Sequence, residues 1–275
     1  MIVAPGIFAA VVFLPLALLV NRIHRGCRRR RCMRTPLSAG WIEIIRQGVE
    51  LYSCLPEELK TELHGHVQNF LAEKHFEGCG GLTLTEEMKV TIAAQACILL
   101  LNRKTTYFPK CDSILVYPSA YIATQKRSMG AVQVEERSVR LGESWTQGTV
   151  VLAWDEVARE ARDLSGGRNV VLHEFAHQLD QEDGMGDGTP ILESRGSYAE
   201  WARVLGGDFL RLRDEVRHHD RDVIDAYGAT NEAEFFAVAT EAFFDKGAEL
   251  RRRHPDLYEQ LKKYYRMDPA EWKSR

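Results

Sequence analysis

The sequence lacks any large excess of charge of one sign, since 36 Lys and Arg residues face 39 Asp and Glu residues and the net charge is -3. A chain with this balance has no global basic field, so we predict no direct contact with nucleic acid for the body of the protein. Apolar residues are not scarce: they make up 45% of 275 residues, which excludes a disordered chain and suffices for one large domain or two small ones. Internal repeats are absent, which excludes solenoid and propeller folds.

Charge is absent altogether from residues 2–20, a run of nineteen apolar or neutral residues. Such a run, as a helix, is long enough to cross a hydrocarbon core of about 30 Å. It has neither the charged start nor the small-residue cleavage site of a signal peptide, so we interpret it as an uncleaved anchor. Arginines follow the run and none precedes it, which predicts that the C-terminal side stays in the cytoplasm. These arginines are Arg22, Arg25, Arg28, Arg29, Arg30, Arg31 and Arg34.

These patterns predict a single-pass membrane protein in three parts. They are a transmembrane anchor at residues 1–21, an arginine-rich juxtamembrane linker at 22–40 and a folded domain at 41–269. The arginines could instead bind nucleic acid, but the anionic inner leaflet beside the apolar run is the more economical partner.

The cysteines form no C-x-x-C pair, and all six fall in the first 111 residues. On the reducing side of a membrane they are expected to be free thiols. Cys27 and Cys32 adjoin the apolar run, so palmitoylation is an alternative to inert thiols at these two positions.

Periodicity in the folded domain predicts an α+β class, mostly helical with a small sheet. Apolar residues recur at helical spacing over 41–76, and a further helix is expected after Thr85, a good N-cap followed by acidic residues. Helical periodicity returns after Asp163. Between these regions, β-branched and aromatic residues indicate strands within 113–124, 131–139 and 148–157.

The segment VVLHEFAHQLDQEDG, residues 170–184, contains the pattern H-E-x-x-H at His173, Glu174 and His177. On a helix, two histidines four residues apart lie on one face and can bind one metal ion, while Glu174 stands beside the open coordination position. There a carboxylate can accept a proton from zinc-bound water as the water attacks a carbonyl carbon. The pattern arises by chance in roughly 3% of chains of this composition, so a metal site requires a third ligand.

Two short-spaced zinc classes are excluded by the residues after the motif. One needs glycine at 180 and histidine at 183, where this chain has Asp180 and Asp183; the other needs an aspartate where it has Leu192. A carboxylate on a later apolar helix remains, and Glu234 and Glu241 fall seven residues apart on nearly one face. Carboxylates are rarely embedded in such a helix without a partner, although a first-turn glutamate favoured by the helix dipole is the alternative.

Asp180 lies three residues beyond His177 and seven beyond His173, hence on the same helix face. It is a candidate acceptor for an imidazole N–H, which would set the ring orientation. The alternative is a carboxylate at the helix end that faces water.

Five segments together resemble the Mlc titration factor A family of zinc-dependent peptidases, whose catalytic domain is similar to that of anthrax lethal factor. They run in order over about residues 42 to 269: ILVYPSAYI, GESWTQGTVVLAWDEV, NVVLHEFAHQLD, DAYGATNEAEFFAVATEAFF and HPDLYEQLKKYYRMDP. The resemblance implies a zincin-like metallopeptidase domain that uses Zn²⁺. The family's pattern after the second histidine also favours Asp180 as the imidazole acceptor.

Roles for single residues follow from this resemblance. It implies that His173, His177 and Glu234 are the zinc ligands and that Glu174 is the general base. It further implies that Tyr227, seven residues before the glutamate ligand, stabilises the developing oxyanion; a phenol suits this because it stays neutral at pH 7.

The leading functional hypothesis is a membrane-anchored, cytoplasmic zinc peptidase that acts on a peptide or protein substrate, with aminopeptidase-like action implied by the resemblance. The family's named partner is a transcriptional repressor, so the alternative is a repressor-binding scaffold with little or no catalysis. The presence of Glu174 and Tyr227 favours catalysis. A third hypothesis is a membrane-surface lipid hydrolase that uses the same zinc ion.

Overall fold

The computed structural model describes residues 20–119, 121–129, 132–140, 142–145, 148–219 and 222–272, with backbone only from 121 to 145. The expected membrane span at residues 2–20 lies outside this part of the chain except for Val20. Within the described ranges, no helix combines the length and apolar character needed to cross a membrane.

The arginine-rich segment is helical over residues 20–32 and contacts the body of the protein. Arg29 donates through Nε and Nη2 to the two carboxylate oxygens of Glu73, at 2.8 and 2.7 Å. Asn69 Nδ2 donates to the backbone carbonyl of Arg29 at 3.2 Å. Glu73 and Asn69 both belong to helix α4, so much of the segment expected as a linker is a helix packed on α4.

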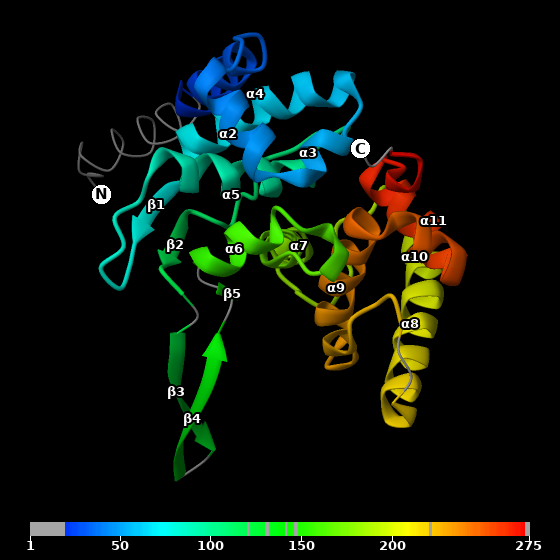
Figure 1. Ribbon diagram of the computed structural model, residues 1–275. Helices are drawn as coiled ribbons and strands as arrows, with labels where there is room; N and C mark the ends of the chain where they lie inside the picture. Colours follow the sequence, from blue (N-terminus) through cyan, green and yellow to red (C-terminus); the bar gives the residue numbers. More distant parts are fainter. Residues whose placement is uncertain are drawn as a thin grey trace, which may run out of the picture.

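The N-terminal half of the domain is a group of helices above the sheet (Figure 1). Their bounds are Ala39–Gly48 for α2, Glu50–Cys54 for α3, Glu57–Glu73 for α4 and Glu86–Ile98 for α5. Thr85 caps α5 as expected, because its hydroxyl accepts a hydrogen bond from the backbone N–H of Met88 at 3.2 Å. The helical periodicity over 41–76 is confirmed as far as Glu73.

The main sheet has four strands in the order β1-β2-β6-β5. The first three are parallel, and β5 pairs with β6 in the antiparallel sense. Their bounds are His75–Gly78 for β1, Ser113–Tyr117 for β2, Thr149–Ala153 for β6 and Gly142–Trp145 for β5. The expectation of helix up to residue 76 was wrong at its end, because His75 and Phe76 begin β1. A four-residue strand that forms by pairing with β2 leaves too few positions for a periodic signal.

A second sheet is the two-stranded antiparallel hairpin of β3 (Tyr121–Met129) and β4 (Val132–Arg140). It extends away from the rest of the molecule in Figure 1. The predicted small sheet in the middle third is therefore confirmed, although its strands divide between a mixed sheet and a separate hairpin.

The C-terminal half is helical again, as expected. Helix α7 lies near the centre of the molecule, with α9 and α8 to one side (Figure 1). Phe175 of α7 fixes its position by packing against Phe70 and Phe108, with ring centroids 5.5 and 4.8 Å apart. The bounds are Trp154–Glu160 for α6, Val170–Asp180 for α7, Arg195–His218 for α8, Glu232–Asp245 for α9, Gly247–Arg253 for α10 and Pro255–Tyr265 for α11.

Candidate metal centre

Helix α7 presents the H-E-x-x-H motif as the sequence predicted. Asn169 caps its first turn, since its side-chain oxygen accepts from the backbone N–H of Leu172 at 3.0 Å. After α7, the 3-10 turn Gln181–Asp183 ends at Gly184, whose φ of 102° lies in the left-handed region that glycine adopts without strain. Between these ends, the imidazole centroids of His173 and His177 are 4.9 Å apart on one face.

Glu234 of α9 meets both imidazoles. Its Oε2 atom lies 3.0 Å from Nε2 of His173 and 3.3 Å from Nε2 of His177. Candidate ligand atoms of the three residues all lie within 4.8 Å of one another. The first turn of α9 holds Glu234 in place, because the Asn231 side chain accepts a hydrogen bond from its backbone N–H at 2.9 Å. The structure thus brings together the three residues that the family resemblance implied as ligands, although Glu234 lies about sixty residues after the two histidines.

The donor set fits a cation because His173 lies between two carboxylates. Its Nδ1 is 2.7 Å from Oε1 of Glu241, and its Nε2 faces Glu234. If Nδ1 donates to Glu241, a neutral imidazole has a lone pair at Nε2, which would face a carboxylate oxygen unless a proton or a metal ion lies between them.

The ionisation of these groups reflects the same arrangement. Burial alone would lower the pKa of His173, but its bonds to Glu234 and Glu241 raise that pKa well above the ordinary value. Burial would raise the pKa of Glu234, yet the two imidazoles lower it to about 2. The site therefore holds the ionised carboxylate of Glu234 next to two imidazoles. Two imidazoles and one carboxylate are a ligand set that suits Zn²⁺.

Glu241 orients the site from behind His173. One carboxylate oxygen bonds Nδ1 of His173, and the other accepts from the backbone N–H of Asn169 at 2.6 Å. A single buried side chain thereby sets both the ring orientation and the start of α7. The sequence placed Glu241 on the same face as Glu234 but considered it only as a ligand.

Asp180 has a different role from the one predicted. Its Oδ2 accepts from the backbone N–H of Gly188 at 2.9 Å, and Oδ1 has no hydrogen-bond partner among the described residues. The expectation that Asp180 accepts an imidazole N–H was wrong. The physical reason is that the loop after α7 folds back and places the backbone N–H of Gly188 against this carboxylate.

Gly188 is the point where that loop contacts both metal-site helices. Besides its bond to Asp180, its carbonyl accepts from Nε1 of Trp201 at 3.0 Å. A Cβ atom at Gly188 would lie 2.4 Å from the backbone oxygen of Glu232, in the first turn of α9. No feature of the sequence indicated this close contact.

The two candidate catalytic residues occupy different surroundings. Glu174 is buried on α7, with 4% of its surface exposed, whereas Tyr227 is 54% exposed. The Tyr227 ring lies 6.0 Å from that of His173, in a short 3-10 turn in which Asp225 accepts from its backbone N–H at 2.9 Å. The phenol is therefore beside the metal-site cluster and accessible from solvent, where a substrate would approach.

Two histidines of an H-E-x-x-H helix and a glutamate of a second helix are the ligand set of a metallopeptidase-type hydrolase, and the family match supports this class. The chain belongs to the M90 family of glucose-regulated metallo-peptidases, whose family model matches residues 24–266. That match begins inside the arginine-rich helix and extends over the main sheet, the hairpin and all the later helices.

Individual relatives support the same conclusion. An uncharacterized protein of Synechocystis sp. is 41% identical over 244 residues, which cover 88% of this chain and 89% of that protein. Mlc titration factor A of Yersinia pestis and of Yersinia pseudotuberculosis are each 32% identical over 236 residues, 84% of this chain and 85% of theirs. The resemblance to the Mlc titration factor A family is thereby confirmed.

Proposed function

We propose that the protein is a zinc-dependent peptidase in which His173, His177 and Glu234 hold the ion. The observation that carries this proposal is the convergence of their donor atoms, all within 4.8 Å, next to a buried glutamate on the same helix. When bound, zinc would supply a Lewis acid for a peptide carbonyl and would lower the pKa of a water molecule.

Three residues would then have separate roles in the reaction. Glu174 would accept the proton of the attacking water and pass it to the leaving amine. The Tyr227 hydroxyl would donate a hydrogen bond to the developing oxyanion. Glu241 would keep the proton of His173 on Nδ1, so that Nε2 presents its lone pair to the metal site.

A peptide substrate is supported by the position of β5. Among the described strands it pairs only with β6, and it packs against α7. An edge strand offers backbone N–H and C=O groups to an extended peptide, which a lipid substrate could not pair with. This favours peptide hydrolysis over the lipid hydrolase considered from the sequence. Aminopeptidase-like action remains part of the proposal.

The proposal includes a single-pass anchor at residues 2–20 with the catalytic domain in the cytoplasm. It is supported by the uncharged N-terminal run and the arginines that follow it. A reporter at the carboxyl end should be protected from protease added outside intact cells. Cleavage of that reporter from outside would refute the orientation.

A second candidate function is binding of a transcriptional repressor with little or no catalysis. The name of the Yersinia relatives, Mlc titration factor A, favours it. A scaffold of this kind has no use for a general base or a phenol beside the metal site, and this chain has both.

The test separates metal binding from catalysis. His173→Ala and Glu234→Ala should lose zinc, measured by elemental analysis of the purified protein, because each removes one of three protein ligands. Glu174→Gln should retain zinc while peptide hydrolysis falls by about 10²–10⁴-fold. Tyr227→Phe should also retain zinc and lose on the order of 10²-fold in turnover.

A Glu174→Gln protein that stays fully active would refute the hydrolytic mechanism. In cells, new protein amino termini that appear with wild type and not with Glu174→Gln would identify substrates. If repressor binding persists in both proteins while no new termini appear, the scaffold is the correct function.

A further inference from the structure

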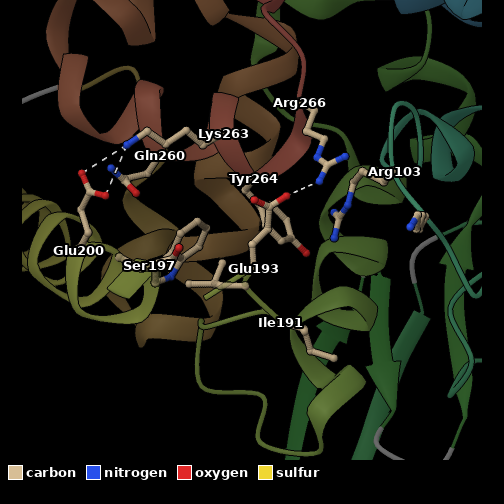
Figure 2. Close-up of a pocket in the computed structure, with 12 residues that line it drawn as sticks. Arg103, Ile191, Glu193, Ser197, Glu200, Gln260, Lys263, Tyr264 and Arg266 are labelled. Atoms are coloured by element: carbon tan, nitrogen blue, oxygen red, sulfur yellow. Dashed lines mark hydrogen bonds and ion pairs between the residues drawn. The ribbon is translucent and has the colours of Figure 1, made fainter. Parts of the chain in front are cut away.

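A pocket of about 710 Å³ lies between the segment after α5, the loop before α8 with the N-terminal half of α8, and the end of α11 (Figure 2). None of its lining residues belongs to the metal centre. Its volume is within the range of roughly 300–1,000 Å³ typical of sites for small organic ligands.

The lining carries more positive than negative charge. Glu193 pairs with Arg266, and Glu200 pairs with Lys263 at 3.4 Å, on two different sides of the pocket (Figure 2). Two further cations line it without a carboxylate at ion-pair distance among the described residues. They are Arg103 and Lys104.

The Arg103 guanidinium stacks on Tyr264, and one of its nitrogens has no acceptor among the described residues. Its guanidinium carbon lies 4.1 Å from the centroid of the Tyr264 ring, and stacking of this kind fixes the guanidinium plane. Its Nη1 atom is buried and has no hydrogen-bond acceptor among the described residues. A buried charged donor without an acceptor is unfavourable, and the planar fork of arginine matches the paired oxygens of a carboxylate or phosphate.

The uncharged lining is only partly apolar, since it comprises Ser197, Gln260 and Tyr264 as well as Ile191, Leu192 and Trp201. Of the apolar residues, Trp201 is largely buried, with 2% of its surface exposed. The indole N–H of Trp201 is already bonded to the carbonyl of Gly188, so the ring can offer a ligand only apolar contact. An occupant that satisfies this pocket therefore combines an oxyanion with an apolar body.

We propose that this pocket is a second binding site, for a small organic anion whose carboxylate or phosphate meets Arg103 and Lys104. Its apolar part packs on Ile191, Leu192 and Trp201. The site is separate from the proposed peptidase centre, and its test depends on binding and not on hydrolysis.

The test uses the full chain in a non-ionic detergent, with calorimetric titration of three probes. These are 3-phenylpropionate, phenyl phosphate and the neutral 3-phenylpropanamide. Both anions should bind, and the amide should bind at least tenfold more weakly than 3-phenylpropionate because it cannot form the charged pair. The preferred anion identifies the source as a carboxylate or a phosphate ester.

Arg103→Gln should weaken binding of both anions at least tenfold, and Arg103→Lys should have an intermediate effect because it keeps the charge and loses the fork. Arg252→Gln is the matched control, since Arg252 is 74% exposed on α10 and outside the pocket. If Arg103→Gln does not fold, the exposed Lys104→Gln takes its place, with a several-fold loss expected.

Three results would overturn the proposal. The amide could bind as tightly as the acid, which would show that charge is not recognised. The anions could bind Arg103→Gln as tightly as wild type, which would place them elsewhere, for example on the metal ion. Finally, if neither anion binds, the pocket holds only solvent.

Discussion

Single side chains determine how tightly the metal centre is organised, and Glu241 is the clearest case. It is not among the three proposed ligands, yet it bonds His173 and the backbone N–H of Asn169 at the start of α7. We expect Glu241→Gln to keep the fold and to weaken zinc affinity by about 10–100-fold, because an amide is a poorer partner for Nδ1–H. Competition with a chelator measures the affinity.

Glu249→Gln is the control for that change, because Glu249 is partly exposed on α10 and away from the site. Restoration by Glu241→Asp is not expected, because the shorter side chain cannot span from α9 to both partners. Unchanged zinc affinity in Glu241→Gln would show that the two bonds serve only the fold.

Asp245, in contrast to Glu241, is a buried carboxylate that no hydrogen bond stabilises among the described residues. Neither of its oxygens has a hydrogen-bond partner among the described residues, and it ends α9, where the helix dipole disfavours negative charge. Burial raises its pKa well above the ordinary value of 3.8, and the nearby Glu241 and Glu160 raise it further. The folded state therefore binds a proton that the unfolded state releases.

Because the folded state binds this proton more tightly, the free energy of unfolding falls as the pH rises from 3.8 toward the raised pKa of Asp245. Asp245→Asn removes the ionisation, so it should raise the free energy of unfolding by about 1–3 kcal/mol at pH 7, with a smaller gain at pH 4. Urea unfolding at the two pH values measures both. An equal effect at pH 4 and pH 7 would contradict the assigned ionisation.

Among the secondary-structure elements, the loop after α7 fixes the position of α9 relative to α7, the two helices that carry the proposed ligands. Gly188 has φ of 81° and leaves no room for a Cβ atom against the backbone of Glu232. Gly188→Ala should destabilise the protein by about 1–3 kcal/mol and weaken zinc binding, because the first turn of α9 must shift and Glu234 moves with it. Urea unfolding and chelator competition measure the two effects.

Gly186→Ala is a closely matched control. Gly186 also has positive φ, 64°, but a Cβ atom there would meet only the flexible side chain of Gln181 at 3.3 Å. It should lose stability through backbone strain alone and keep its zinc affinity. Equal zinc affinity in the two variants would show that the loop does not position α9.

For the whole molecule, the helix at residues 20–32 is part of the folded body. Glu73 is largely buried and its carboxylate is satisfied by Arg29 and Arg28. Arg29→Gln should lower the free energy of unfolding by about 1–3 kcal/mol, because it leaves a mostly buried charge with one partner fewer. The neighbouring Arg30→Gln, at an exposed position, should have little effect.

The same contacts predict where the chain can be shortened. A chain that begins at residue 35 should have a thermal midpoint several degrees lower than a chain that begins at residue 20. Equal thermal midpoints for the two shortened chains would mean that the helix at residues 20–32 contributes nothing to stability.

Local features of the domain could be predicted because their causes lie within a few residues. The start of α5 at Thr85 depends on a side chain next to the helix end. The single face shared by His173 and His177 follows from helix geometry alone. The charge balance and the uncharged N-terminal run are likewise properties of the sequence, and the expected membrane span remains a prediction from it.

Other features were decided only by tertiary structure, because the partner of a side chain is set by packing between distant segments. Glu241 reaches His173 across 68 residues, and Asp180 meets Gly188 because the loop folds back. Strand β1 exists through its pairing with β2, and Arg103 faces a pocket that three separate segments enclose. Periodicity placed the metal-site residues on the correct helices; the packing of α9 on α7 determined which carboxylate meets the imidazoles and which one orients them.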